Sequence, residues 1–451
     1  METKKLADAL DENLFSSKLF KKAYVFYAFW LILSPLIETL FCSFGMKFLV
    51  MLQMILLLFL FGLTKLFELL FNFRNISFKN KTIVDLLLVI LFAWVMLSTI
   101  ITNTFNYGFM FALCYFSSIC LFLNIDKKFF KTMAIVFVAE MVFDSFLGLI
   151  DLENKFVPGF DTENFTMSMQ FFNPNWSAVV IIIAEILSLM MIVFSQKTWQ
   201  KILLFVGMIV MSVGLFVGGS YAPETALFVC ELAMLIFLWI KNKKCPWWVL
   251  GTLLSTIFIS FAVWWVPAFR NVTTARANYF YETLAVIDDN LGTSLVKQVS
   301  TIFNKLFGWD IFSKVPGSDG WDRAELTRRA MEAVFANFKT FTFGNGCSFI
   351  SDLRVHDCYL VIWMEFGTIA LLTYLAIFVM LLVRFIRVKK STQIVFLFAG
   401  LVMLLFESLF CCIEPFCYPF MAVFFVVVYR ELYSAELKPK KDSKEQKIEK
   451  K

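Results

Sequence analysis

A dozen apolar runs, each about as long as a bilayer-spanning helix, divide this chain of 451 residues. A spanning helix needs roughly 20 apolar residues, and hydrophobic residues make up 60% of the chain while charged residues make up 17%. A soluble chain of this length could not bury that much apolar surface in one or two cores. The sequence therefore predicts an all-α, polytopic membrane protein of about 12 transmembrane helices. The predicted spans lie at about 23–43, 46–64, 84–102, 106–124, 131–150, 176–195, 202–219, 222–240, 246–266, 357–383, 393–413 and 415–430.

Basic residues are distributed unevenly between the short loops of this predicted bundle. If the N-terminus is cytoplasmic, the loops on the cytoplasmic side hold Lys65, Arg74, Lys79, Lys81, Lys127, Lys128, Lys131, Lys197, Lys201, Lys241, Lys243, Lys244, Arg384, Arg387, Lys389 and Lys390. The opposite loops are neutral or acidic, as at Asp151, Glu153, Asp161 and Glu163. This bias follows the positive-inside rule, so both termini are expected in the cytoplasm.

The spans and their connections predict five segments. These are a cytoplasmic N-terminal segment (1–22), transmembrane helices 1–9 (23–266), a large extracytoplasmic loop (267–356), transmembrane helices 10–12 (357–430) and a cytoplasmic Lys-rich tail (431–451). The first segment is polar and charged, so no cleavable signal peptide is predicted there. The large loop is much longer than a simple connection requires, which is typical of loops that carry function.

An amphipathic helix is predicted inside this large loop. Asp322 can cap it while Glu325 reaches back to the cap. Leu326, Ala330, Val334 and Phe338 then repeat every four residues as an apolar stripe, with Met331 and Phe335 beside it. We expect this helix to lie at the outer membrane surface.

Charge and motif composition exclude several classes of function. The net charge of +6 comes from short loops and the tail, where topology and anionic lipids explain it, so no nucleic-acid partner is predicted. Most of the ten cysteines fall inside apolar runs, and none has metal-site spacing. The chain has neither a DxD metal–nucleotide motif nor a phosphate-binding P-loop. We therefore expect no metal and no cofactor, and we disfavour a nucleotide-sugar or ATP-driven mechanism.

Three short motifs occur in order around the end of the large loop. Arg323 opens the predicted amphipathic helix, Gly344-Asn345-Gly346 follows, and His356, the only histidine, leads through Asp357-Cys358-Tyr359-Leu360 into an apolar helix that contains Gly367. This order resembles the O-antigen ligase and polysaccharide polymerase superfamily of bacterial membrane proteins, over roughly residues 200–383. The twelve-helix layout with a large outer loop is similar to that family as well.

Two positions depart from the family pattern. Asp357 stands where the family usually has Asn, and Ser220-Tyr221-Ala222 stands where it often has Ser-Arg-Gly. The missing arginine helps to bind the donor pyrophosphate in the family, and Arg270 or Arg276 of the large loop could replace it. Arg328 is an alternative to Arg323 as the equivalent of the family arginine, because the spacing to Gly344 is longer than usual.

The resemblance implies glycosyl transfer from a polyprenyl-pyrophosphate-linked oligosaccharide, outside the cytoplasm, at a bacterial plasma membrane. A neutral imidazole at His356 could accept the proton of an attacking sugar hydroxyl. A guanidinium at Arg323 could stabilise the departing pyrophosphate without a metal. Tyr359 is either an interfacial anchor or a substrate contact. Membrane lipid and a chain-length regulator are the other expected partners.

Alternative functions remain open on the sequence. The leading interpretation is a polymerase of lipid-linked repeat units for a surface polysaccharide such as a capsule or exopolysaccharide. A ligase would transfer the same glycan to a lipid or another envelope acceptor, and a flippase would move the lipid-linked oligosaccharide across the membrane. A flippase would be consistent with the acids predicted inside the spans. These acids could line a path, or they could form hydrogen bonds within the bundle. Those acids are Glu38, Glu140, Asp144, Glu185, Glu231, Glu365 and Glu407.

Overall fold

The protein is all-helical in the part of the chain that the structure describes. The computed structural model describes residues 17–34, 36–37, 47–71, 82–105, 107–150, 174–218, 221–265, 323–346, 357–389, 391–408, 419–435 and 437. Within these residues there are fourteen helices and one isolated bridge, between Val388 and Leu437.

Each of the twelve predicted apolar runs overlaps a helix of the structure. These are α2 (Ser17–Ile32), α4 (Lys47–Phe71), α5 (Ile83–Thr102), α6 (Tyr107–Leu123), α7 (Lys127–Ile150), α8 (Pro174–Phe194), α9 (Thr198–Gly218), α10 (Tyr221–Asn242), α11 (Trp247–Trp265), α16 (Cys358–Arg387), α17 (Thr392–Glu407) and α18 (Pro419–Ser434). The other two helices, α14 (Arg323–Phe335) and α15 (Phe338–Phe343), belong to the predicted large loop.

Five helical stretches in the described residues are long and apolar enough to cross a membrane. They are Ile83–Thr102, Phe129–Leu149, Ser177–Phe194, Thr198–Val217 and Cys358–Arg387. Several such helices in one chain indicate a multi-pass membrane protein. The count of twelve spans stays a prediction.

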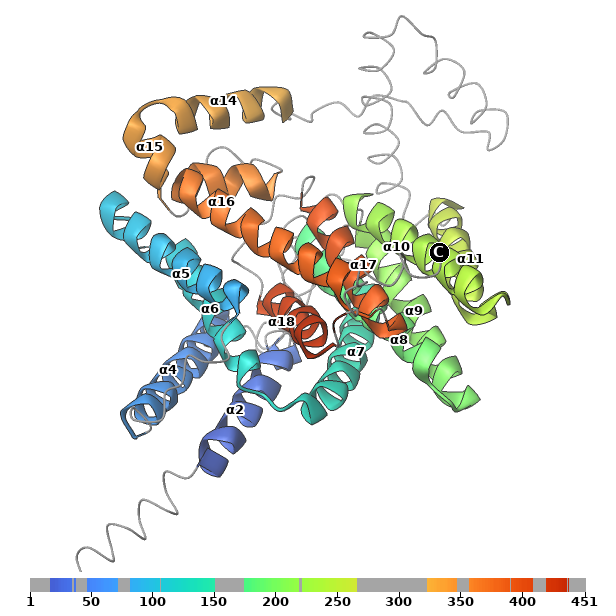
Figure 1. Ribbon diagram of the computed structural model, residues 1–451. Coiled ribbons are helices and arrows are strands. Elements are labelled where there is room, and N and C mark those ends of the chain that lie inside the picture. Colours follow the sequence, from blue (N-terminus) through green and yellow to red (C-terminus); the bar gives the residue numbers. More distant parts are fainter. Residues whose placement is uncertain are drawn as a thin grey trace, which may run out of the picture.

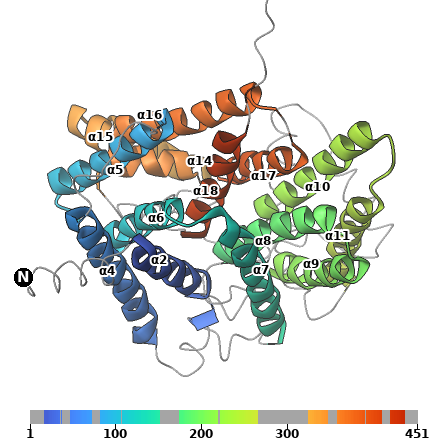
Figure 2. The ribbon, with the colours of Figure 1, turned by 60° about the horizontal axis from the view of Figure 1, so that its bottom comes forward.

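Helix α8 lies at the centre of the bundle. In Figures 1 and 2, α2, α4 and α6 lie on one side of the molecule and α9, α10 and α11 on the other, with α7, α8 and α18 between them. Of the apolar stretch of α8, 78% is buried, as expected for a helix that is hydrophobic on every face. In contrast, α5 exposes Ile83, Leu86 and Val89, which indicates a lipid-facing surface.

Three buried acids accept hydrogen bonds from neighbouring segments of the bundle. Glu140 of α7 accepts a hydrogen bond from the backbone N–H of Leu36 (2.9 Å). Glu185 of α8 accepts one from the Ser212 hydroxyl of α9 (2.7 Å), and Glu231 of α10 accepts one from the Thr256 hydroxyl of α11 (3.3 Å). These bonds favour a role in helix packing, because hydrogen bonds between segments contribute to the association of helices in a membrane.

The other predicted intramembrane acids are placed as follows. Asp144 and Glu365 are buried on α7 and α16, whereas the side chains of Glu38 and Glu407 lie outside the described residues.

The predicted amphipathic helix is shorter than expected. We predicted a stripe that continues to Phe338, but α14 ends at Phe335 and Phe338 opens α15 with 81% of its surface exposed. The reason is a new N-cap: the Asn337 side chain accepts from the Thr340 backbone N–H, and the Thr340 hydroxyl accepts from the Asn337 N–H. Such a capping box starts a separate helix.

Candidate functional site

The start of α16 is fixed to α17. Asp357 caps the helix, because its carboxylate accepts hydrogen bonds from the backbone N–H groups of Tyr359 (2.8 Å) and Leu360 (3.1 Å). The Cys358 N–H donates to the Ser408 carbonyl (2.9 Å), and the Tyr359 hydroxyl donates to the Leu405 carbonyl (2.8 Å). The cap and these two bonds therefore hold the first turn of α16 at the end of α17.

Helix α16 is broken at Gly367. This glycine has φ 79° and ψ −179°, a conformation that essentially only glycine adopts. We predicted one continuous helix over 357–383, and the structure corrects this to two segments, which meet at Gly367. A non-helical residue at this place is tolerated in a membrane protein only where the freed backbone groups find partners in the protein.

Those partners come from outside the helix. The carbonyl of Met364 accepts from the Asn345 N–H (2.8 Å), and the carbonyl of Glu365 accepts from the Gly346 N–H (3.0 Å). The carbonyl of Phe366 accepts from the indole N–H of Trp94 on α5 (2.9 Å). The last carbonyls before the break are therefore satisfied by two segments that are distant in sequence.

The glycines of Gly344-Asn345-Gly346 are required by this close packing. Gly344 and Gly346 have φ values of 78° and 100°, where L side chains are strained. A Cβ atom at Gly344 would collide with the backbone of Glu365, and a Cβ atom at Gly367 would collide with the backbone of Thr342. The end of α15 and the break in α16 thus fit together only because neither side carries a side chain at the contact.

Helix α5 supports the same junction from the other side. The Trp94 ring stacks on Phe343 with 5.0 Å between ring centroids and 9° between ring planes. The Ser98 hydroxyl donates to the Phe343 carbonyl at 2.5 Å. The sequence interpretation missed both residues, and their only signals were a tryptophan and a serine inside an apolar run.

Helix α14 packs along the first segment of α16. Ala330 and Val334, both fully buried, form a cluster with Leu360, Val361 and Met364. The apolar stripe predicted for the loop helix is thus covered by α16.

Helix α14 and the first segment of α16 lie side by side and begin at the same end. The Asn345 side-chain amide donates to the carbonyls of Ala333 (3.5 Å) and Met364 (3.2 Å), so these two positions lie at the same level. Ala330 precedes Ala333 by one turn, just as Leu360 precedes Met364 in the shared cluster. The first segment of α16 therefore runs beside α14 in the same direction (Figure 1).

The structure describes some of the predicted site residues, whereas others lie outside the described part of the chain. Arg323 is the first residue of α14 and Arg328 lies in its second turn, and only their backbone is described. Arg323 precedes Ala330 by seven residues, so it lies on the face of α14 that packs against α16, about 10 Å further along the axis toward the start of both helices. Tyr359 lies in the first turn of α16. His356, Arg270 and Arg276 lie outside the described residues.

The structure therefore brings the three motif segments together. The Arg323 helix, Gly344-Asn345-Gly346 and the start of α16 form one packed unit, which lies at one end of the bundle (Figure 1). We call it the outer unit, after the side of the membrane that the sequence predicts for it. Tyr221, which stands where the related motif has arginine, opens α10. Among the described residues, no three His, Cys, Asp or Glu side chains gather as metal ligands.

No protein-family model matches the chain, and no curated protein sequence is significantly similar to it. The class that the fold itself defines is a multi-pass helical membrane protein with a broken helix beside a helical loop segment.

Proposed function

We propose that this chain is a membrane enzyme that polymerises polyprenyl-pyrophosphate-linked oligosaccharide repeats into a surface polysaccharide, without a metal. The observation that supports it best is the outer unit. Its three segments are those of the motif resemblance, and they lie up to 44 residues apart between Arg323 and Gly367. The glycine segment is nevertheless joined to α16 by backbone hydrogen bonds, and α14 packs on α16 through apolar side chains. On this proposal the unit faces outside a bacterial plasma membrane.

The proposed reaction is a single displacement at a sugar carbon. The hydroxyl oxygen of an acceptor sugar attacks the anomeric carbon of the donor, and a carbon–oxygen bond forms. The bond from that carbon to the pyrophosphate oxygen breaks, and polyprenyl pyrophosphate leaves with the bonding electrons. The hydroxyl proton passes to the imidazole of His356, which acts as general base.

The outer unit has a charge suited to a pyrophosphate. The helix dipoles of α14 and α16 place partial positive charge at the end where both helices begin, and α14 carries Arg323, Arg328 and Arg329 in its first two turns. Asp357 already occupies the first N–H groups of α16. Arg323, with Arg328 as the alternative, is therefore proposed to bind the leaving group, because a guanidinium pairs with phosphate oxygens bidentately.

The hydrogen bonds at the start of α16 and at its break give the outer unit the rigidity that catalysis needs. Helix α16 is held at its start by α17 and at Gly367 by Asn345, Gly346 and Trp94. In the sequence, His356 directly precedes Asp357, the cap of this helix end, and rigid placement of reacting groups contributes strongly to rate.

Elongation in a purified system tests the proposal. The full chain would be reconstituted in nanodiscs, in the presence of a chelator and without nucleotide, with lipid-linked single repeats extracted from cells that lack the protein. We expect longer lipid-linked glycans on a gel. Transfer to a non-prenyl acceptor instead would make the protein a ligase, and activity seen only as movement across sealed liposomes would make it a flippase.

Variants assign the residues. His356→Gln and Arg323→Lys should each lower elongation at least 100-fold, since Gln cannot take the proton and Lys lacks the planar fork. Arg387→Lys, an exposed position at the other end of α16, is the matched control and should elongate normally. Normal elongation by His356→Gln would remove His356 from the mechanism, and Arg328→Lys tests the alternative arginine.

A further inference from the structure

A groove of about 760 Å³ lies between α4, α5 and α6. Most of its lining is apolar, with Phe61 and Leu66 on α4, Leu86 and Val89 on α5, and Ile119 on α6. A space of this size is far larger than the voids that a packed protein interior leaves open, and it is in the range of ligand sites. We therefore expect an occupant with an apolar surface.

The groove is open along its side. Leu66 and Val89 both line it, yet they are 51% and 63% exposed, so the described part of the chain does not enclose it. The α5 wall, from Asp85 to Phe92, belongs to the stretch Ile83–Thr102, which is long and apolar enough to cross a membrane. The medium beside such a stretch is lipid hydrocarbon, so an acyl chain can enter from the side.

Gly62 makes room in the α4 wall. The residue lines the groove and is exposed, and a Cβ atom there would meet nothing within 4 Å. Glycine weakens a helix relative to alanine, and one use of glycine is to let another molecule approach the backbone closely. The space beside Gly62 is therefore suited to a chain that lies directly on the backbone of α4.

The two ends of the groove differ. Phe92 of α5 and Phe116 of α6 meet edge to face with 5.1 Å between ring centroids, and Lys65, Asp85 and Asn124 line the other end. From Asp85 to Phe92 the groove follows α5 for about 10 Å, roughly a third of the hydrocarbon core of about 30 Å. An acyl chain that enters at the polar end thus stays within one leaflet, which the sequence predicts to be the cytoplasmic one.

The charged side chains of the lining have partners within the protein. Lys65 pairs with Glu68 (2.6 Å) and donates to the Asn124 side chain (3.2 Å), and the Asp85 carboxylate accepts from the Tyr429 hydroxyl (3.0 Å). The connection between α4 and α5 adds three basic residues that lie outside the described part of the chain, Arg74, Lys79 and Lys81. The site is accordingly defined by its apolar walls, and no headgroup is assigned to it.

We propose that this groove binds one acyl chain of a membrane glycerolipid, which fills the space between α5 and the neighbouring α4 and α6. Bulk lipid is as apolar as the walls, so the chain is held by van der Waals contact with three helices rather than by leaving water. None of the groove residues belongs to the outer unit, so this inference does not rest on the proposed enzymatic function.

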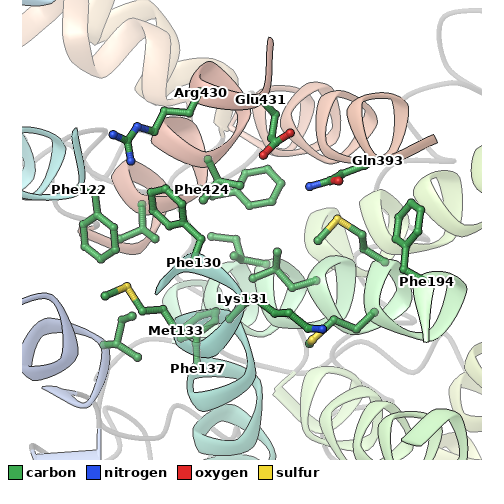
Figure 3. Close-up of a pocket in the computed structure, with 18 residues that line it drawn as sticks. Phe122, Phe130, Lys131, Met133, Phe137, Phe194, Gln393, Phe424, Arg430 and Glu431 are labelled. Carbon is green, nitrogen blue, oxygen red and sulfur yellow. The ribbon is translucent and has the colours of Figure 1, made fainter. Parts of the chain in front are cut away.

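A second cavity, of about 420 Å³, offers a comparison within the same molecule. It lies between α7, α8 and α18, and the rings of Phe130 and Phe424 line it (Figure 3). Met190 and Met191 of α8 line it as well, and flexible methionines fill irregular gaps. Its α8 wall belongs to a stretch that is 78% buried, whereas only 28% of the α5 stretch is buried. We therefore expect acyl chains in the groove rather than in this cavity.

Native mass spectrometry of the delipidated full-length protein tests the groove. The probe is dioleoylglycerol, which has acyl chains but no charged headgroup, and we expect one molecule to be retained per chain. Gly62→Trp places a ring in the groove and should lower the occupancy at least fivefold. Val206→Trp, at a position of α9 that is 50% exposed, is the matched control and should leave the occupancy unchanged.

Three outcomes would overturn the proposal. The first is undiminished retention by Gly62→Trp, and the second is an equal loss in Val206→Trp, which would show that the lipid merely surrounds the protein. The third is retention of phosphatidylglycerol but not of dioleoylglycerol, which would show that a headgroup is recognised instead of the chain.

Photolabelling keeps the proposal testable if Gly62→Trp does not fold. The wild-type protein would be labelled with a phosphatidylglycerol that carries a photoreactive group on its acyl chain. Labels within 61–66, 85–92 and 116–124 would support the groove. Labels confined to α9, or to 183–194 and 423–431 around the second cavity, would refute it.

Discussion

Gly367 of α16 lies directly against the backbone of Thr342 in α15, so closely that no Cβ atom fits between them. The contact has a second requirement, because Gly367 also has φ 79° and ψ −179°. Both conditions exclude every residue except glycine. The break in α16 and its contact with the loop helices therefore depend on the same residue.

Gly367→Ala should destabilise the fold strongly. The backbone strain contributes about 1–3 kcal/mol and the overlap with Thr342 a further 1–3 kcal/mol or so. Thermal unfolding in detergent measures the effect as a lower midpoint. The matched control is Gly62→Ala in α4, where a Cβ meets open space and alanine should stabilise the helix by about 0.5–1 kcal/mol. Equal midpoints for the two variants would contradict the collision.

Trp94→Phe separates ring packing from the indole hydrogen bond. Phenylalanine can keep the stack on Phe343 but cannot donate to the Phe366 carbonyl. A buried carbonyl left without a donor costs about 1–3 kcal/mol, and hydrogen exchange around the break should increase. Trp239→Phe on α10, where the ring is 57% exposed, is the control and should change stability by no more than about 0.5 kcal/mol. A loss as large in the control would show that the indole bond contributes nothing specific.

Asp357 can be tested as a helix cap independently of any chemistry. Asparagine is as good a cap as aspartate, whereas alanine typically costs about 1 kcal/mol. Asp357→Asn should therefore unfold like the wild type, and Asp357→Ala should unfold earlier by that amount. Asp357→Asn also restores the residue that the resembling family usually has, so we expect it to retain elongation in the assay above. Loss of elongation with unchanged stability would assign a chemical role to the carboxylate.

Long apolar runs made most of the fold predictable. The run predicted at 84–102 is a helix over Ile83–Thr102, since a membrane leaves few options other than a helix. The ends were less predictable where polar turns continue the helix beyond the apolar run. Helix α9 begins at Thr198 rather than at 202, and α2 begins at Ser17 rather than at 23 and ends at Ile32.

The site was predictable only in part. Gly344, Gly346 and Gly367 were identified as motif residues by resemblance, but their physical reason is a contact between segments, which no local pattern reveals. Trp94 and its acceptor Phe366 are 272 residues apart, and a tryptophan in an apolar helix is equally typical of a membrane interface. Such long-range pairs depend on tertiary packing and have no periodic signal in the sequence.

Arg384 holds the C-terminal ends of α16 and α18 together, and a lysine should not replace it. Its guanidinium donates to the carbonyls of Leu432, Tyr433 and Ala435 at 3.1, 3.3 and 3.1 Å and lies over the Tyr433 ring at 5.0 Å. The last carbonyls of a helix have no partners within it, and a cation is favourable at a helix C-terminus. A lysine ammonium keeps the charge but cannot reach three acceptors in this planar arrangement.

Arg384→Lys should therefore lower the free energy of unfolding by about 1.5–3 kcal/mol, the range for hydrogen bonds to charged groups. Limited proteolysis should cut after α18 faster than in the wild type, because the end of that helix loses its attachment to α16. Arg387→Lys, at an exposed position one turn further along α16, is the control and should be cut at the wild-type rate. If both variants resist proteolysis equally, the three carbonyl bonds do not hold this end of the bundle, and the ends of α16 and α18 must be held by apolar packing alone.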